Sequence, residues 1–403
     1  MGRIISVVHR VKRSAEGEAR PTLVAIKGED GVKTYKLETE QDELDFVTDS
    51  YPIEWRKFAE GMELTGILER HIVREKKTGE PKKVPAEYGG LIQGDTVVMA
   101  LGGSGDRLAF AMRRSGKVEV MRIAPFKLKE ARNGNDKNND HLLLLDLFQK
   151  YPALFNLMSD RDADLVFVRE AFTARQDAMK ARIACEQRLY QRLIGRIFLS
   201  DGIYPEGRLE EEYDLAKASD TVLQNLLTEE KRCETILKKA VRKLAVWQNV
   251  FEPLEGVGEM IAARLIVSIG DIRRFKTKHQ LKKFCGVHVL DDGRFARRRN
   301  GEVANWSPEA RQALYLLGEQ FNRRPNSVWG RKLLEYKAKF HIKYPQPIES
   351  ENDAGKRVKK FTDGHIHKMA IWRTLTKFVE WLHREWSRTD GVAELLSAEV
   401  EKD

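Results

Sequence analysis

The sequence predicts a mixed α/β domain followed by an all-α region. β-Branched runs alternate with helix-like segments over residues 1–155, and helical periodicity dominates residues 156–250. A compact helical region with glycine turns follows over residues 251–386, before a tail at 387–403. The chain has 403 residues, enough for two or three cores, since single domains usually hold roughly 100–200 residues.

The composition favours a polyanionic partner. Lysine and arginine number 71 against 61 acidic residues, which gives a formal charge of +10. A merely solvated basic surface is the alternative. The three cysteines show no paired spacing, which argues against a disulfide framework or a zinc site. No apolar run approaches the ~20 residues that cross a bilayer. We expect a cytoplasmic protein, prokaryotic or phage-encoded, with no membrane partner.

Two parts of the N-terminal region carry strand patterns. Residues 3–12, 22–27 and 33–37 are β-branched runs that predict a β-meander, and helices are expected over 41–48 and 54–74, before an exposed basic loop over 75–90. Residues 96–101, 106–114 and 117–123 then predict a strand, a helix and a strand, and 141–148 predicts a further helix. Such a unit usually pairs two parallel strands, with ligand chemistry at the strand ends.

Residues 160–250 predict a long antiparallel helical hairpin, interrupted once at 199–208. Apolar residues recur along it at three- and four-residue spacing, among them Leu223, Leu226, Leu227, Ile236, Leu237, Ala240, Leu244 and Val246. Because long hairpins of this kind often associate, we expect a homodimer through the hairpin. Packing within one chain is the alternative. A polar linker at 345–360 then precedes a last helix at 365–386, and the tail is expected to be partly disordered.

Two glycines, Gly256 and Gly258, form a tight turn that opens a predicted helix. A glycine turn at a helix N-terminus can approach a phosphate closely, because no Cβ intervenes and the helix dipole favours an anion. Cations follow this turn in a dense run: Arg273, Arg274, Lys276, Lys278, Lys282, Lys283, Arg294, Arg297, Arg298 and Arg299. These residues, with the two glycines, are the predicted RNA-binding residues, since cations neutralise phosphates and release counterions.

Phenylalanines at positions 275, 284 and 295 are interleaved with the cations. Flat aromatic faces can stack on unpaired bases, which favours single-stranded or looped RNA as the ligand. Core packing of the same rings is the alternative. Only His365 and His367 are spaced closely enough to suggest a metal pair, and on a helix they face different sides, so no metal site is expected.

The stretch LEGVGEMIAARLIVSIGDIRRFKTKHQLKKFCGV, which begins at Leu254, closely resembles the C-terminal domain of pilin-inversion type insertion-sequence transposases, the bridge-RNA-guided recombinases. PEARQALYLLGEQF and HKMAIWRTLTKFVEWLHREW fit the rest of that domain. The region also resembles the Nop domain of box C/D ribonucleoproteins, where a coiled-coil hairpin precedes an RNA-gripping module. Together these resemblances cover nearly the whole chain.

The resemblance implies an N-terminal RuvC-like fold with four metal-binding acids. At the matching positions this chain has Val7, Ala100 and Leu143, and only Asp140 remains as a residual acid. The family's nucleophilic serine lies in the loop that here reads VHVLDDGR, residues 287–294. One acid cannot hold a two-metal site. We therefore expect a degenerate RuvC-like domain with no catalytic residues and no cofactor.

Such a nuclease-poor relative with a Nop-like domain resembles the Tas proteins of tandem interspaced guide RNA systems. That resemblance implies a guide RNA as partner and a target DNA recognised mainly through the RNA. Two alternatives stay open. One is an active RNA-guided transposase or nuclease that uses Mg²⁺ with unaligned acids such as Asp106, Asp136, Asp140 or Asp146. The other is a structural ribonucleoprotein scaffold that never touches DNA.

Overall fold

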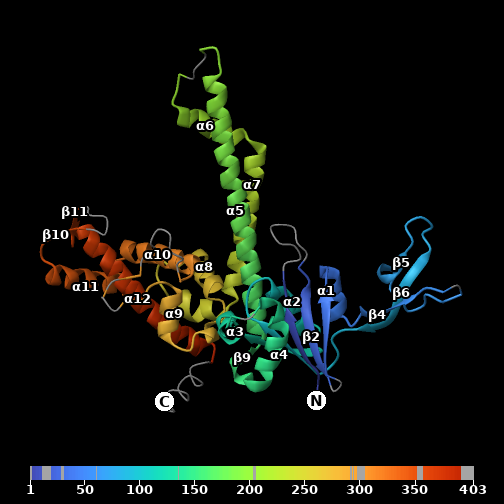
Figure 1. Cartoon of the computed structure of the whole chain (residues 1–403). Helices are drawn as coiled ribbons and strands as arrows, with labels where there is room; N and C mark the ends of the chain where they lie inside the picture. Colours follow the sequence, from blue (N-terminus) through green and yellow to red (C-terminus); the bar gives the residue numbers. More distant parts are fainter. Residues whose placement is uncertain are drawn as a thin grey trace. The chain divides into compact units, whose positions relative to one another are not determined.

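A computed structural model describes residues 2–10, 20–28, 31–59, 61–134, 136–202, 206–290, 293, 295–296, 305–351 and 357–391. The chain divides into two compact units, Met1–Val166 and Phe167–Asp403 (Figure 1). The first unit is α/β and the second is mostly helical, as the sequence predicts. Among the described helices, none is both long enough and apolar enough to cross a membrane.

The main sheet of the first unit has the strand order β3-β2-β1-β7-β8-β9 within the described residues. Its strands are β1 (Ile4–Val8), β2 (Thr22–Gly28), β3 (Gly31–Leu37), β7 (Asp95–Ala100), β8 (Val118–Ile123) and β9 (Phe155–Leu157). β1, β7 and β8 run parallel, whereas β2 is antiparallel to β1 and to β3, and β9 is antiparallel to β8. The predicted meander and the predicted parallel strand pair are both confirmed.

Helices cover both faces of this sheet. The helices are α1 (Glu40–Val47), α2 (Gly105–Arg114), α3 (Pro125–Arg132) and α4 (Asp140–Lys150), with short 3-10 turns η2 (Lys137–Asn139) and η3 (Pro152–Leu154). Strand side chains alternate between faces. Ile5 and Val7 therefore pack in the core that holds residues of α1 and α2, and Ile4 and Val8 pack in the core that holds residues of α3 and α4.

The predicted helix at 54–74 and the predicted loop at 75–90 are wrong. A second sheet occupies this segment, with order β4-β6-β5. Its elements are β4 (Tyr51–Lys57), η1 (Glu69–His71), β5 (Val73–Arg74) and β6 (Pro81–Gly89). β6 pairs antiparallel with both other strands, and Lys83 lies over the Trp55 ring at 5.1 Å. The basic residues Lys82 and Lys83, which suggest a loop, are exposed on β6, whose longer partner β4 lies more than twenty residues earlier in the sequence.

The second unit contains the predicted helical hairpin. It consists of α5 (Asp160–Phe198), which begins in the first unit, α6 (Leu209–Ser219) and α7 (Thr221–Arg242). The interruption expected at 199–208 separates α5 from α6. Cys185 and Leu189 of α5 pack against Leu223 of α7 in a small apolar core. Glu230 of α7 also forms ion pairs with two arginines of α5, at 3.0 and 2.5 Å.

A helical assembly follows the hairpin. Its elements are η4 (Trp247–Phe251), α8 (Glu259–Ile269), η5 (Ile272–Arg274), α9 (Lys278–Phe284), α10 (Pro308–Arg323), α11 (Val328–Lys343), β10 (Ile348–Glu351), β11 (Arg357–Lys360) and α12 (Asp363–Thr389). α12 packs against α9, α10 and α11. The segment predicted as a linker, 345–360, contains the antiparallel pair β10 and β11 instead. The expectation for the tail lies largely outside the described residues, apart from the last turn of α12.

Candidate nucleic-acid interface

The glycine turn has the backbone that the sequence predicts. Gly256 has φ +84°, a left-handed conformation, and a Cβ added there would lie 2.7 Å from Nη1 of Arg324. Gly258 is the N-cap of α8, with open space where its Cβ would be. Only Gly258 therefore leaves room for a ligand to approach the backbone closely.

An acidic side chain already lies at this helix N-terminus. Glu259 is the first residue of α8 and forms an ion pair with Arg242 of α7. Burial acts to raise the pKa of Glu259, but hydrogen bonds from its own backbone N–H and from Arg242 outweigh burial and lower that pKa. The carboxylate therefore stays ionised beside the amides, and a phosphate has to compete with it.

Two of the predicted cations, Arg273 and Arg274, contact neighbouring side chains of the protein. Arg273 forms an ion pair with the buried carboxylate of Asp271, at 2.8 Å. The guanidinium carbon of Arg274 lies 5.0 Å from the ring centroids of both Phe275 and Phe284. Burial lowers the pKa of Arg274. These contacts give both arginines structural roles and leave Phe275 buried rather than open to a base.

Lys282 is also engaged, through an acidic residue of α12. Its Nζ lies 2.8 Å from Glu380, which forms a second ion pair, also at 2.8 Å, with Lys377. Burial acts to raise the pKa of Glu380, but hydrogen bonds from the two lysines outweigh it and bring that pKa to about 2. Glu380 therefore links the predicted basic run to the side of α12 that carries Lys377.

Three predicted cations are open to solvent. Lys276 precedes α9, and Lys278 and Lys283 lie on it, with all three side chains exposed. No ion pair of Lys278 or Lys283 is found among the described residues. Within the described part of the basic run, these lysines are the cations most available to phosphates.

The remaining predicted cations, Arg294, Arg297, Arg298 and Arg299, lie outside the described residues. A further arginine of the second unit is Arg311 of α10, which the sequence did not single out. Arg311 donates hydrogen bonds to the carbonyls of Gly286 and Ala296, at 2.8 and 2.7 Å. Its guanidinium lies 4.6 Å from the rings of both Trp306 and Trp372. No local signal marks this residue, because its partners come from three separate segments.

In the first unit, the positions compared with metal-binding acids do not share one face of the sheet. Val7 is 1% exposed and packs in the core with α1 and α2, whereas Ala100 and Leu143 pack in the core with α3 and α4. A shift of one residue along a strand reverses its face. Ser6, which donates a hydrogen bond to the carbonyl of His141 in α4 at 2.5 Å, and Val8 lie on the same face of the sheet as Ala100. Neither side chain is an acid, and the comparison of Val7 with a metal-binding aspartate stays a prediction.

The remaining acid of this set, Asp140, has a structural partner. Its two carboxylate oxygens accept hydrogen bonds from Arg132 of α3, at 2.8 and 2.7 Å. The residues at these positions therefore do not fit a two-metal site, since alkyl side chains supply no ligand atoms and the one carboxylate is occupied.

The unaligned acids also make contacts of their own. Asp106 is buried beside Arg122, at 3.4 Å. Asp136 caps η2 by accepting from the backbone of Asn138, and Asp146 pairs with Lys150. Among the described residues, no group of three or more His, Cys, Asp or Glu side chains is arranged to hold a metal ion.

A comparison with protein families bears on the helical assembly of the second unit. Residues 248–329 match the model of the transposase IS116/IS110/IS902 family. The matched stretch runs from η4 into the start of α11 and includes the glycine turn, α9 and Arg311. This part of the chain is transposase-like. No curated protein matches the chain.

Proposed function

We propose that the chain binds a guide RNA through its second unit and pairs with target DNA through that RNA, without cutting it. The observation that carries the proposal is the position of the transposase match. It covers the segment in which Lys276, Lys278 and Lys283 are exposed. Exposed lysines neutralise phosphates, and the RNA supplies the base pairing that selects the DNA.

The absence of cleavage is part of the proposal. We regard the first unit as a degenerate RuvC-like domain, supported by its parallel strands β1, β7 and β8 with α4 on one face. No carboxylate is supplied on that face by Ser6, Val8, Ala100 or Leu143. The carboxylate of Asp140 accepts hydrogen bonds from Arg132. Divalent-metal strand cleavage needs a carboxylate cluster at such a site.

A second candidate function, RNA-guided recombination, is favoured by the family match itself. Incubation of the purified protein with its RNA, matched DNA and Mg²⁺ separates the two. The proposal predicts a shifted ternary complex with intact DNA strands on a denaturing gel. Nicked or joined strands would favour the recombinase, and binding of RNA without any DNA complex would favour a ribonucleoprotein scaffold.

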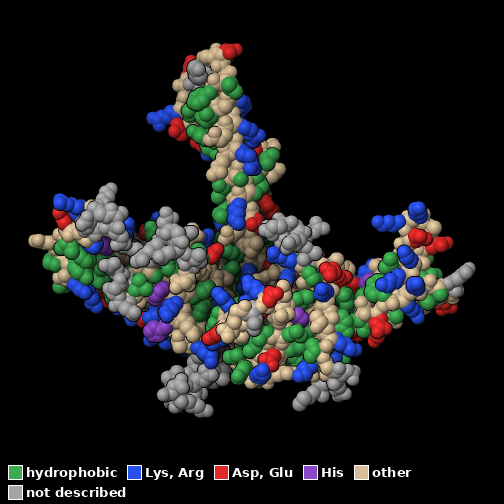
Figure 2. Space-filling model, viewed as in Figure 1, with side chains coloured by type: hydrophobic (Ala, Val, Ile, Leu, Met, Phe, Trp, Pro, Cys, Tyr) green, Lys and Arg blue, Asp and Glu red, His purple; other side chains and the backbone are tan. Residues whose placement is uncertain are grey.

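We also propose that the hairpin mediates a homodimer. Large apolar side chains are exposed towards its end, over α6 and the neighbouring ends of α5 and α7 (Figure 2). They include Phe198, Leu199, Leu215 and Val222, each more than half exposed. Exposed apolar patches of this kind often mark association surfaces.

Light scattering after size exclusion tests the dimer. The account predicts a mass of twice 46.4 kDa for the natural chain and a monomer for Leu215→Lys combined with Val222→Lys. Both side chains are exposed, so the hairpin itself should fold in this variant. A monomeric natural chain at micromolar concentration contradicts the dimer but leaves the RNA-binding proposal intact.

A further inference from the structure

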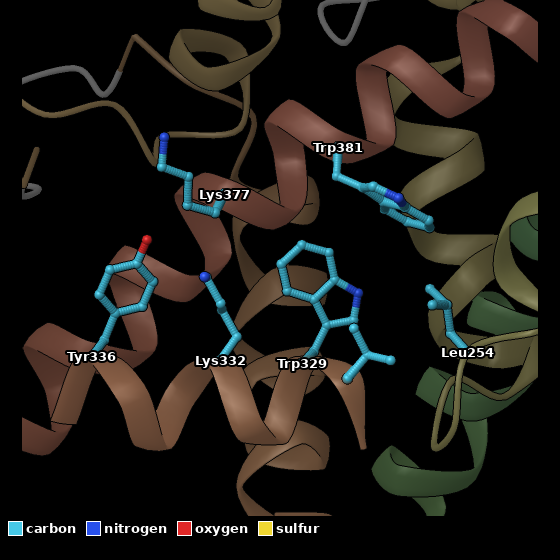
Figure 3. Close-up of a pocket in the computed structure, with 7 residues that line it drawn as sticks. Leu254, Trp329, Lys332, Tyr336, Lys377 and Trp381 are labelled. Atoms are coloured by element: carbon cyan, nitrogen blue, oxygen red, sulfur yellow. The ribbon is translucent and has the colours of Figure 1, made fainter. Parts of the chain in front are cut away.

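An aromatic pocket lies on the second unit, beside the glycine turn. It has a volume of about 480 Å³ and is bounded by α11, α12 and Leu254. Figure 3 shows its walls, with Trp329, Lys332 and Tyr336 rising from α11, and Lys377 and Trp381 from α12. The volume is within the range of small-ligand sites, which typically occupy ~300–1,000 Å³.

The two indoles of the pocket pack against buried phenylalanine rings. Trp329 stacks on Phe321 with ring centroids 5.9 Å apart and lies 5.2 Å from Phe378. Trp381 lies 5.5 Å from the same Phe378. The indoles meet at 68° with centroids 5.7 Å apart, and both are partly exposed. They form a preformed corner, in which a flat group can stack on one ring while its edge meets the other.

Lysines supply positive charge at this corner. The side chains of Lys332 and Lys377 are each 40% exposed, and each pairs with an acid three residues later on its own helix. The Lys332–Glu335 pair lies at the surface, and such pairs contribute only about 0–1 kcal/mol, so an incoming phosphate can displace it. Lys377 shares Glu380 with Lys282, so that acidic charge is divided between two lysines.

We propose that this pocket binds one unpaired nucleotide of a single-stranded nucleic acid, with the base against the indoles and a phosphate at the lysines. The inference rests on the proposed function and specifies one contact within it. Flat apolar faces beside cations complement a base joined to a phosphate. An apolar peptide would use the indoles but not the lysines. The pocket also lies in the same unit as α9, which presents further lysines to a bound strand.

Anisotropy titrations of the full chain with a labelled single-stranded oligonucleotide test the pocket. We expect Trp381→Leu to weaken binding about 5- to 150-fold, as removal of one base stack does. Trp381→Phe retains a ring and should restore most of the affinity. Lys332→Ala combined with Lys377→Ala should reduce the salt slope of binding by about 1.4. The matched control is Arg331→Ala with Lys343→Ala, two exposed cations of α11 that do not line the pocket.

The same titrations are repeated with an abasic oligomer and with RNA and DNA oligomers of the same sequence. The Trp381→Leu effect should vanish on the abasic oligomer, and the preferred strand identifies the nucleic acid that supplies the base. Thermal melting followed by circular dichroism confirms that each variant is folded. If the natural chain binds no oligonucleotide, the proposed function fails. If the natural chain binds the oligonucleotide and the folded pocket variants bind it with the same affinity, only the pocket inference is overturned. That result would favour an apolar peptide as the ligand of the pocket.

Discussion

The accessibility of the predicted cations gives a quantitative prediction about RNA binding. Lys276, Lys278 and Lys283 are exposed, so each can neutralise one phosphate. For a single-stranded ligand, each such contact contributes about 0.7 to the slope of log affinity against log salt. Replacing all three by alanine should therefore reduce the magnitude of that slope by about 2.

The measurement is fluorescence anisotropy with a labelled RNA over a series of KCl concentrations, for the natural chain and the triple variant. Because the three side chains are exposed, the variant should keep the natural melting temperature. A slope unchanged within about 0.5 would refute the assignment of these lysines to phosphates.

Arg274→Ala is the contrasting variant. It removes a guanidinium packed against two rings, so we expect a lower melting temperature. At a temperature where the variant stays folded, its salt slope should equal that of the natural chain. A slope reduced by about 0.7 without loss of stability would show that Arg274 contacts phosphate and that the separation of structural from binding cations is mistaken.

Three further outcomes are expected. Gly286→Ala should lower the free energy of unfolding by about 2–4 kcal/mol, because Gly286 has φ +66° and a Cβ would lie 2.8 Å from Trp306. An unchanged midpoint of chemical denaturation would contradict this tight packing. Asp140→Asn weakens the hydrogen bonds from Arg132, so it should lower the free energy of unfolding by about 1–3 kcal/mol and leave RNA affinity unchanged. Loss of a Mg²⁺-dependent activity in this variant would instead identify Asp140 as a catalytic acid. The pKa of Glu380 is lowered from 4.5 to about 2, so its stabilisation is present above pH 4.5 and lost as pH falls towards 2. Glu380→Gln should flatten unfolding free energy against pH in that window, and an unaltered profile argues against the lysine pairs.

Local patterns predict the first unit well where strands neighbour each other in sequence. β2 and β3 are separated by two residues in the sequence, and β7 and β8 flank α2, so short-range periodicity identifies them. β4 and β6 pair across more than twenty intervening residues, and the charged side chains of β6 suggest a loop. Their pairing is a tertiary contact that no local window contains.

The candidate site shows a similar limit. The sequence identifies the segment that holds the cations but cannot separate exposed lysines from Arg274, whose partners depend on the packing around α9. The glycine turn is predicted correctly, but the ion pair of Glu259 with Arg242 at the start of α8 is not. Trp381 can be noted as an aromatic residue on a basic helix. Its pairing with Trp329 requires α11 and α12 to pack together.

The family resemblance is most sensitive to register. An alignment offset of one residue in β1 exchanges Val7 for Ser6 or Val8 and reverses the face of the sheet. The inference that this strand supplies no acid survives the shift, because none of the three side chains is a carboxylate. Side-chain alternation in the structure, rather than similarity of letters, decides which residue faces α4.

Sequencing of the RNA that copurifies with the full chain tests the central claim most directly. The account predicts a short, discrete RNA that carries spacers able to pair with DNA, enriched in the natural protein and depleted when Lys276, Lys278 and Lys283 are replaced by alanine. A heterogeneous population of cellular RNA, present equally in both preparations, would contradict a specific guide-RNA-binding function.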